Sequence, residues 1–323
     1  MNSISRRTFL AGSAGAAALA LTACGGSGSS DASGDKTYKI GVLQLTQHAA
    51  LDAANEGFVE ALDASGIKYT VDQQNANNDQ SACATIASKL VGDGDDLIFA
   101  IATPAAQAVA AATSDIPIVG SAITDYAASG LVADNDKPGG NLTGTSDMNP
   151  VDDQIAMLQK VLPEAKHIGM LYCTAESNSQ LQIEMAEAAC DKAGLTTERF
   201  TVSSSNEIQS VVESMVGKVD AGYSPTDNTI AAAAAQVGQI AKEGKLPFIT
   251  GEENMCMGMG ICTVSIDYKE LGKMAGEMVV KILKGEDTPA NMAIETEAGD
   301  QLQTIKNEEM AEALGIDLSV LDA

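Results

Sequence analysis

The sequence predicts an α/β fold of two similar lobes, each a doubly wound parallel sheet, joined by a hinge of several strands. From residue 38 onward, apolar runs of strand length alternate with segments of helical periodicity, a pattern typical of parallel sheets with right-handed crossovers. The same order of motifs then recurs at nearly one offset, which indicates two lobes of one βαβ build. The matched segments are 40–43 with 168–171, 96–103 with 220–226, and 116–119 with 246–249.

The stretch 96–117 organises the first half of the chain. Residues 97–102 are apolar and follow a polar lead, so they predict a buried strand. Thr103 is a good helix N-cap and Pro104 is tolerated at the first helical position, so a helix is expected from Ala105. Free N–H groups at such a junction suit a small anion such as a carboxylate. The same junction is also ordinary α/β architecture, and the residues alone leave both interpretations open.

The other elements follow in order. Helix 51–62 has apolar residues at i, i+3, i+7 and i+11 and ends at Gly66, and a helix starting near Tyr268 is expected to pack back on the first lobe. The first half adds strands 39–45, 69–73 and 116–121 and helix 81–91, and the second half adds helix 152–162, a strand over 292–305 and helix 308–314. We therefore expect lobe 1 at 37–146 plus about 266–290, and lobe 2 at 147–265 plus about 291–323.

Composition excludes several functions. A net charge of −25 leaves no basic surface for nucleic acid. The chain has only two histidines, lacks a CxxC pair and a nucleotide-binding GxxxxGK[ST] motif, and shows no legible Ser/His/Asp arrangement. We therefore expect no metal, no cofactor and no enzyme activity. The rival expectation, a doubly wound hydrolase or dehydrogenase, requires a nucleophile with a base or a GxGxxG motif after the first strand.

The N-terminus predicts export and lipid anchoring. Residues 1–23 have the pattern of a signal peptide, in which 5–10 resemble a twin-arginine signal, although general export stays open. Leu21-Thr22-Ala23-Cys24 looks like a lipobox with Cys24 as the lipidated residue; a plain signal peptide with a chance cysteine is the alternative. The Gly/Ser-rich stretch 24–36 suits a flexible tether. These features place the protein outside the cytoplasm, on the outer face of the cell membrane.

Ligands of open α/β sheets bind beyond the carboxyl ends of the strands. When two lobes face each other, these ends line one cleft. The segments expected there are 44–48, 103–104, 122–125, 173–178, 223–228 and 251–254.

Several long strings resemble one family, the ABC transporter substrate-binding lipoproteins of the tryptophan/tyrosine type, which have the type I periplasmic-binding-protein fold. The strings include IGVLQLTQHAALDAANEGF (40–58), KPGGNLTGTSDMNPVDDQ (137–154) and VGKVDAGYSPTDN (216–228). The resemblance covers nearly all of the mature chain. It implies a monomer that binds an amino acid, often aromatic, and hands it to a membrane permease driven by an ATPase. A sensor receptor of the same fold remains the alternative.

The resemblance also implies ligand contacts. The implied set is Gln44, Thr103 with the following backbone amides, Pro104, Ala105, Asp125, Ser146, Asp147, Asn178, Tyr223, Thr226, Asp227, Asn228 and Glu252. Thr103 and its helix would hold the α-carboxylate, and Asp227 or Asp125 would pair with the α-ammonium. Tyr126, Tyr172, Tyr223 and Tyr268 are candidates to flank the ligand's side chain.

For some residues, a purely structural role is the alternative to ligand contact. Asp227-Asn228 is also a good helix start, Tyr268 is expected to serve packing, and His48 is expected to be a turn residue.

One segment departs from the family pattern. Residues 251–262 continue with methionines and cysteines after Glu252, which suits either an adaptable apolar pocket or a core. Cys256 with Cys262 is a candidate disulfide, and Cys173 with Cys190 is a weaker one; Cys83 completes the five cysteines after Cys24.

Overall fold

The computed structural model describes residues 36–322. The predicted signal peptide (1–23), the lipidation site Cys24 and almost all of the tether 24–36 lie outside the described residues. Within 36–322, no helix is both long and apolar enough to cross a membrane.

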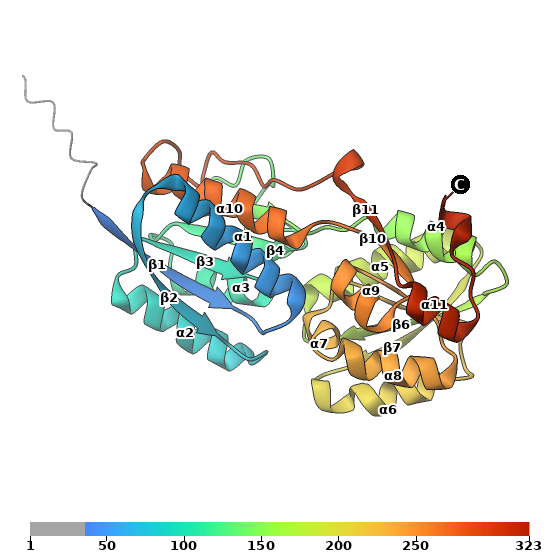
Figure 1. Ribbon diagram of the computed structural model, residues 1–323. Helices are drawn as coiled ribbons and strands as arrows, with labels where there is room; N and C mark the ends of the chain where they lie inside the picture. Colours follow the sequence, from blue (N-terminus) through green and yellow to red (C-terminus); the bar gives the residue numbers. More distant parts are fainter. Residues whose placement is uncertain (1–35, 323) are drawn as a thin grey trace, which may run out of the picture. The chain divides into compact units, whose positions relative to one another are not determined.

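The first lobe is built on a five-stranded sheet in which every strand pair is parallel (Figure 1). Three of its helices lie between successive strands in the sequence. A fourth, α10, comes from much later in the chain and packs on α1 and β4. The strand order is β2 (Lys68–Asn75), β1 (Thr37–Gln44), β3 (Leu97–Ile101), β4 (Ile118–Ile123) and β5 (Leu142–Ser146); the helices are α1 (Ala49–Ser65), α2 (Gln80–Asp93), α3 (Thr103–Ala112) and α10 (Tyr268–Leu283).

The second lobe has a six-stranded sheet of the same winding with one added strand. The strand order is β11 (Gln303–Lys306), β10 (Cys262–Ser265), β9 (Phe248–Thr250), β8 (Ala221–Ser224), β6 (His167–Cys173) and β7 (Thr196–Val202). Its helices are α4 (Val151–Val161), α5 (Ser177–Lys192), α6 (Ile208–Met215), α7 (Asn228–Ala231), α8 (Ala234–Gly244), α9 (Glu253–Met259) and α11 (Glu308–Leu314).

Two expectations about the second lobe need correction. The sheet is not wholly parallel, because β11 runs antiparallel to β10. The strand expected over 292–305 is only β11 at Gln303–Lys306. The preceding residues lie along the first lobe instead: Thr143 Oγ1 donates to the Met292 carbonyl over 2.8 Å, and Glu295 forms a parallel bridge with Thr145.

The chain passes between the lobes three times, after β5, after β10 and before β11. The passages are tied to one another. The Ile266 N–H donates to Asn149 Oδ1 over 3.0 Å, and the Asp267 N–H donates to Glu297 Oε2 over 2.7 Å. These bonds join the strands of the hinge into one bundle.

Helices α1 and α10 lie side by side in Figure 1 and approach closely because small residues face each other. A Cβ added at Gly272 would lie 1.8 Å from the Ala54 carbonyl oxygen, and one added at Gly57 would lie 1.9 Å from that of Lys269. No side chain larger than hydrogen fits at either position.

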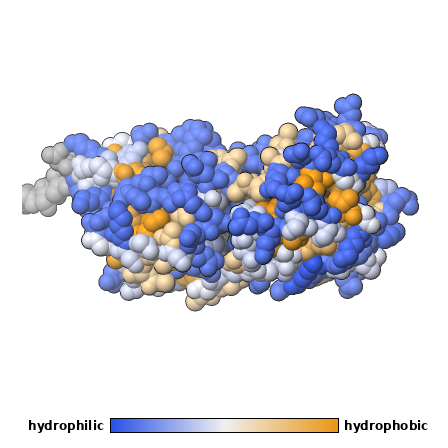
Figure 2. Space-filling view, turned by 90° about the horizontal axis from the view of Figure 1, so that it is seen from below, coloured by the Kyte–Doolittle hydropathy of each residue, from blue (hydrophilic) through white to orange (hydrophobic). Residues whose placement is uncertain are grey.

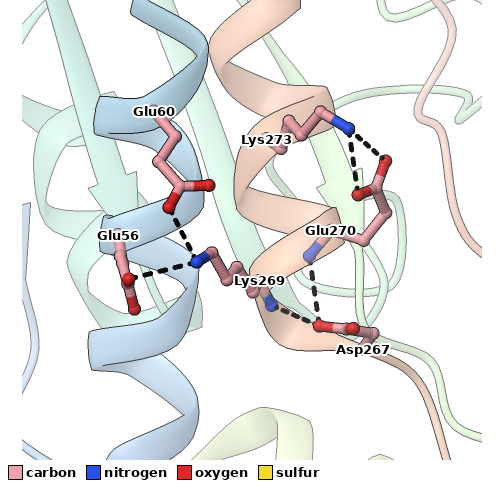
Figure 3. Close-up of polar contacts among 6 residues, drawn as sticks. All are labelled: Glu56, Glu60, Asp267, Lys269, Glu270 and Lys273. Carbon is pink, nitrogen blue, oxygen red and sulfur yellow. Dashed lines mark hydrogen bonds and ion pairs between the residues drawn. The ribbon is translucent and has the colours of Figure 1, made fainter. Parts of the chain in front are cut away.

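Charged residues border the same helix pair, as Figure 3 shows. Lys269 bridges from α10 to Glu56 and Glu60 of α1 at 3.1 and 2.7 Å. Asp267 caps α10 by accepting bonds from the N–H groups of Lys269 and Glu270. Because the lysine and glutamates are exposed, each ion pair contributes at most about 1 kcal/mol, and close packing dominates the contact.

The face of the molecule in Figure 2 is mostly hydrophilic, with hydrophobic side chains in small groups. Of the described residues, Met257 and Val320 are the large hydrophobic side chains that are exposed.

The five cysteines of the described residues are all free thiols and all buried, so neither candidate disulfide forms. Cys256 lies in α9 and Cys262 begins β10, and both are fully enclosed in the second lobe. Burial raises the pKa of the Cys190 and Cys262 thiols to about 12. These thiols are therefore poor nucleophiles.

Candidate functional site

Among the described residues, four side-chain hydrogen bonds join the lobes near the carboxyl ends of their strands, one of which runs from Gln182 Nε2 to Thr124 Oγ1 over 3.3 Å. His48 Nε2 lies 3.1 Å from Asn228 Oδ1, and Asn78 Nδ2 donates to Thr229 Oγ1 over 2.8 Å. Gln80 Nε2 donates to the carbonyl of Ala175 over 2.9 Å. The predicted edges of the two sheets therefore meet.

A cavity of about 10 Å³ lies beside these bonds and is lined from both lobes and from the hinge passages. A second, larger cavity of about 140 Å³ lies on the side of Thr229, where Leu45, Pro104, Cys173 and Glu176 contribute to its wall. The smaller cavity is lined by His48, Ala50, Leu51, Asp147, Thr226, Asp227, Asn228, Ala231, Glu252, Met255 and Tyr268. Its wall combines apolar side chains with three carboxyl groups.

These three acidic groups, Asp147, Asp227 and Glu252, are almost completely buried. Desolvation raises the pKa of Asp147 to about 6 and that of Glu252 to about 7. Desolvation and the nearby Glu176 also raise the pKa of Asp227. Among residues 36–322, no lysine or arginine lines the cavity to balance the acids. A cationic ligand group would lower these pKa values and be bound strongly.

Asp147 follows β5 directly, at the first passage between the lobes. Its Oδ2 accepts a bond from the Tyr268 hydroxyl over 2.7 Å, whereas the buried Oδ1 has no hydrogen-bond partner among the described residues. Tyr268 therefore does more than pack: it lines the cavity and orients Asp147, which corrects the expectation of a purely packing role. The resulting free carboxylate oxygen suits an ammonium group.

Asp227 combines the two roles that the sequence left open. Its Oδ1 accepts from the Ile230 N–H over 2.9 Å and caps α7, while Oδ2 accepts from the Cys173 N–H over 2.6 Å. The same residue lines the cavity. Glu252 is similar: it caps α9 through the N–H groups of Asn254 and Met255 and lines the cavity.

The strand–helix junction at Thr103 differs by one residue from expectation. Ala102, not Thr103, occupies the N-cap position of α3, with φ 85° and ψ 150°, and Thr103 is the first helical residue. A non-glycine residue with this backbone is strained, and such strain is concentrated at functional sites. Thr103 is buried, and its Oγ1 has no partner among the described residues.

The other predicted residues are placed differently. Thr226 and Asn228 line the smaller cavity and Pro104 the larger one, while Ala105 is buried in α3. Asn178 donates to the Thr226 carbonyl over 3.1 Å and so supports the wall without lining it. Ser146 Oγ donates to the carbonyl of Thr124 over 2.7 Å.

Seven predicted residues lie outside both cavity walls: Thr103, Ala105, Ser146 and Asn178, described above, and Gln44, Asp125 and Tyr223. Gln44 donates to Asp52 and to the Thr46 carbonyl. Asp125 accepts bonds from Asn135 and from the Ala128 N–H in its own loop. Tyr223, expected to flank the ligand, is fully buried in the second lobe with its hydroxyl on Gln154 Oε1 at 2.8 Å, because β8 is central in the sheet.

His48, Glu176 and Met255 join the site from segments that the sequence analysis placed at the cleft or considered for a pocket, although none of them was singled out as a ligand contact. His48 lies in the turn before α1, as expected, and also lines the cavity and bonds across to Asn228. Its position directly beyond the first strand was the available signal. Met255 lines the cavity while Met259 is in the core, so the methionine-rich segment serves both purposes.

Comparison with known proteins identifies the family. A family model described as ABC transporter substrate binding protein matches residues 39–320. A tyrosine-binding protein of Clostridioides difficile (strain R20291) is 39% identical over 300 residues, which cover 88% of this chain and 87% of that protein.

Comparison with solved structures supports the same family. An ABC domain from Streptococcus pneumonia in complex with L-Trp has a TM-score of 0.85 at 41% identity, covering 89% of this chain and 98% of that chain. The ligand-free, open structure of a substrate binding protein with adhesive properties from Clostridium difficile has a TM-score of 0.66 at 42% identity, covering 87% and 95%. With its two α/β lobes and a cavity lined from both, the chain belongs to the ABC transporter substrate-binding proteins and has the type I periplasmic-binding-protein fold.

Proposed function

We propose that this protein captures an aromatic amino acid, tyrosine or tryptophan, between its lobes and delivers it to a permease driven by a cytoplasmic ATPase. The names of the relatives support this substrate class: one is a tyrosine-binding protein and another was solved with L-Trp. We further propose that Cys24 carries a lipid that anchors the mature protein, as a monomer and not an enzyme, to the outer face of the cell membrane, with lobe boundaries near residues 146 and 266.

The observation that carries the amino-acid proposal is the unpartnered Oδ1 of Asp147 in a buried, acid-lined cavity. An α-ammonium bound there would satisfy this oxygen and offset the charge of Asp227 and Glu252. The cation and the carboxylates would attract more strongly than in water, because the cavity excludes solvent.

The α-carboxylate would bind at the start of α3. Thr103 Oγ1 is a free donor, and the first N–H groups of a helix attract anions. Pro104, the next residue, lines the larger cavity. Apolar surface for an aromatic ring is supplied by Leu51, Met255 and the ring of Tyr268.

The lobes are proposed to close on the ligand. At nearly equal identity, the structure is more similar to the L-Trp complex than to the ligand-free open relative, with TM-scores of 0.85 and 0.66. The hydrogen bonds between the lobes would then belong to the closed form, which ligand binding favours over an open one.

Isothermal titration calorimetry with L-Tyr, L-Trp, L-Phe, L-Leu and 3-(4-hydroxyphenyl)propionate tests the proposal. We expect the aromatic amino acids to bind tightly and the propionate, which lacks the ammonium, to bind at least 100-fold more weakly. Failure of every aromatic amino acid to bind would refute the substrate class, and equal binding of the propionate would refute the ammonium site. Loss of membrane association on Cys24→Ser is the test of anchoring.

A further inference from the structure

Glu176 holds Asn228 and Thr229, two of the residues through which the second lobe bonds the first. It is 2% exposed and immediately precedes α5. Its Oε2 accepts from the N–H and the Nδ2 of Asn228 over 3.1 and 2.6 Å. Its Oε1 accepts from the N–H and the hydroxyl of Thr229 over 2.9 and 2.7 Å. Because a backbone N–H only donates, both oxygens act as acceptors.

This arrangement fixes the orientation of the Asn228 amide. Its NH₂ group must face the Glu176 oxygen, so its Oδ1 faces His48. Amide oxygens only accept. The hydrogen of the 3.1 Å bond between His48 Nε2 and Asn228 Oδ1 therefore belongs to the histidine.

The tautomer of His48 follows from that bond. Burial lowers the pKa of the imidazole, so the ring is neutral at neutral pH and carries one hydrogen, on Nε2. Nδ1 is then an acceptor. It is buried and has no hydrogen-bond partner among the described residues, and His48 lines the smaller cavity.

We propose that Glu176 is a positioning residue that, through Asn228, presents His48 Nδ1 to the cavity as an acceptor for a ring N–H or O–H of the ligand. This inference rests on the proposed function and refines it: the site would select tyrosine and tryptophan over phenylalanine. The cavity offers two kinds of acceptor. An ammonium would bind the carboxyl groups of Asp147, Asp227 and Glu252, which leaves the neutral imidazole for a neutral donor.

The chain supplies a matched control in the other bond that Glu176 supports. Thr229 Oγ1 accepts from Asn78 across the lobes, in the same way that Asn228 reaches His48, but Asn78 does not line the smaller cavity. Asn78→Ala therefore removes an interlobe bond and leaves the His48 acceptor in place. It should weaken the binding of all ligands alike.

The experiment measures the ratio of Kd for L-Phe to Kd for L-Tyr by calorimetry. A buried acceptor left unpaired by phenylalanine gives an expected ratio of about 10 or more in the wild-type protein. Glu176→Gln places an NH₂ group against a backbone N–H. This disturbs the relay, that is, the chain of hydrogen bonds from Glu176 through Asn228 to His48, so the ratio of the two Kd values should fall to about 3 or less. Asn228→Ala removes the relay but keeps the two backbone bonds to Glu176, and serves if the first variant does not fold.

Two substitutions at His48 separate the acceptor from the interlobe bond. His48→Gln places its amide NH₂ near the position of Nε2 and has no acceptor at Nδ1, so the ratio should fall to about 3 or less. His48→Asn can place an oxygen near Nδ1, so the ratio should stay near the wild-type value, as in Asn78→Ala, although affinities drop.

A wild-type ratio near 1, or a ratio unchanged in His48→Gln, would overturn the inference while leaving aromatic binding intact. Absence of binding by any aromatic amino acid would instead overturn the proposed function, and this inference with it.

Discussion

Asp147→Asn is expected to stabilise the ligand-free protein while weakening ligand binding. The substitution keeps the shape of the side chain and an oxygen to accept from Tyr268, and removes the charge behind the unpartnered Oδ1. Opposite signs for stability and affinity would identify a carboxylate that is retained for binding at a cost to the fold.

The stability gain can be worked from the pKa of this buried group. Its rise from 3.8 to about 6 means that the folded protein favours the protonated acid. At about 1.36 kcal/mol per pKa unit, the ionised form costs the folded state roughly 3 kcal/mol. This cost is absent below the unfolded pKa and grows as pH rises to the folded pKa. The variant should match the wild type near pH 4 and exceed it by about 3 kcal/mol at pH 7.5.

The loss of affinity is set by the ammonium–carboxylate pair. Truncating one partner of a buried charge pair costs about 2–5 kcal/mol, so Kd should rise about 30- to 5,000-fold. Asp125→Asn is the control, because that residue lines neither cavity and should leave Kd unchanged.

Urea unfolding of the ligand-free proteins at pH 4 and pH 7.5 gives the two free energies, and calorimetry at pH 7.5 gives Kd. A variant that is no more stable than the wild type at pH 7.5 would show that Asp147 is not a strained carboxylate. Unchanged affinity would show that the ligand's ammonium binds elsewhere.

Three further predictions concern pH, the anion site and helix packing. Because Asp147 and Glu252 have pKa values of about 6 and 7 without ligand, affinity should rise from pH 5 to pH 8 and binding at pH 6.5 should release protons, measured by calorimetry in buffers of different ionisation enthalpy. Thr103→Val should leave the free energy of unfolding unchanged and raise Kd about 5- to 10-fold, because it removes only the unpartnered hydroxyl. Gly272→Ala should lower the free energy of unfolding in urea by about 1–3 kcal/mol, because its Cβ would lie 1.8 Å from the Ala54 carbonyl oxygen.

Each of these three predictions has a control variant or a result that would contradict it. Affinity that stays flat from pH 5 to pH 8 would exclude the cavity acids as ammonium ligands. An undiminished affinity in Thr103→Val would remove the anion site from α3. Gly92→Ala, in helix α2 with nothing within 4 Å of the added Cβ, should instead gain about 0.5–1 kcal/mol.

The overall winding was predictable because it depends on local patterns. Residues 97–102 gave a strand within one residue of β3, and the helices expected near Tyr268 and at 308–314 begin at Tyr268 and Glu308. The antiparallel β11 was not predictable, because its direction follows from the long return along the first lobe and has no local signature.

The sequence predicted which segments reach the cavity better than it predicted which side chains line the wall. Position beyond the strands placed Thr226, Asp227 and Glu252 at the cavity, but it equally suggested Asp125, which turned out to serve its own loop. The choice among acids depends on side-chain direction. Segment 44–48 was expected at the cleft, but the bond from His48 to Asn228 was not, because a lone histidine in a turn reveals nothing of a partner 180 residues away.

Helix α10 has a consequence for the order in which the polypeptide folds. The surface of α1 that carries Gly57 is covered by helix α10 (268–283), and the whole second-lobe sheet except β11 is synthesised before this helix. A nascent chain that has just completed β5 therefore still exposes that surface to water. The first lobe, although it begins the chain, becomes complete only when synthesis is nearly finished, so a stalled or truncated product would leave the ribosome with an open apolar groove.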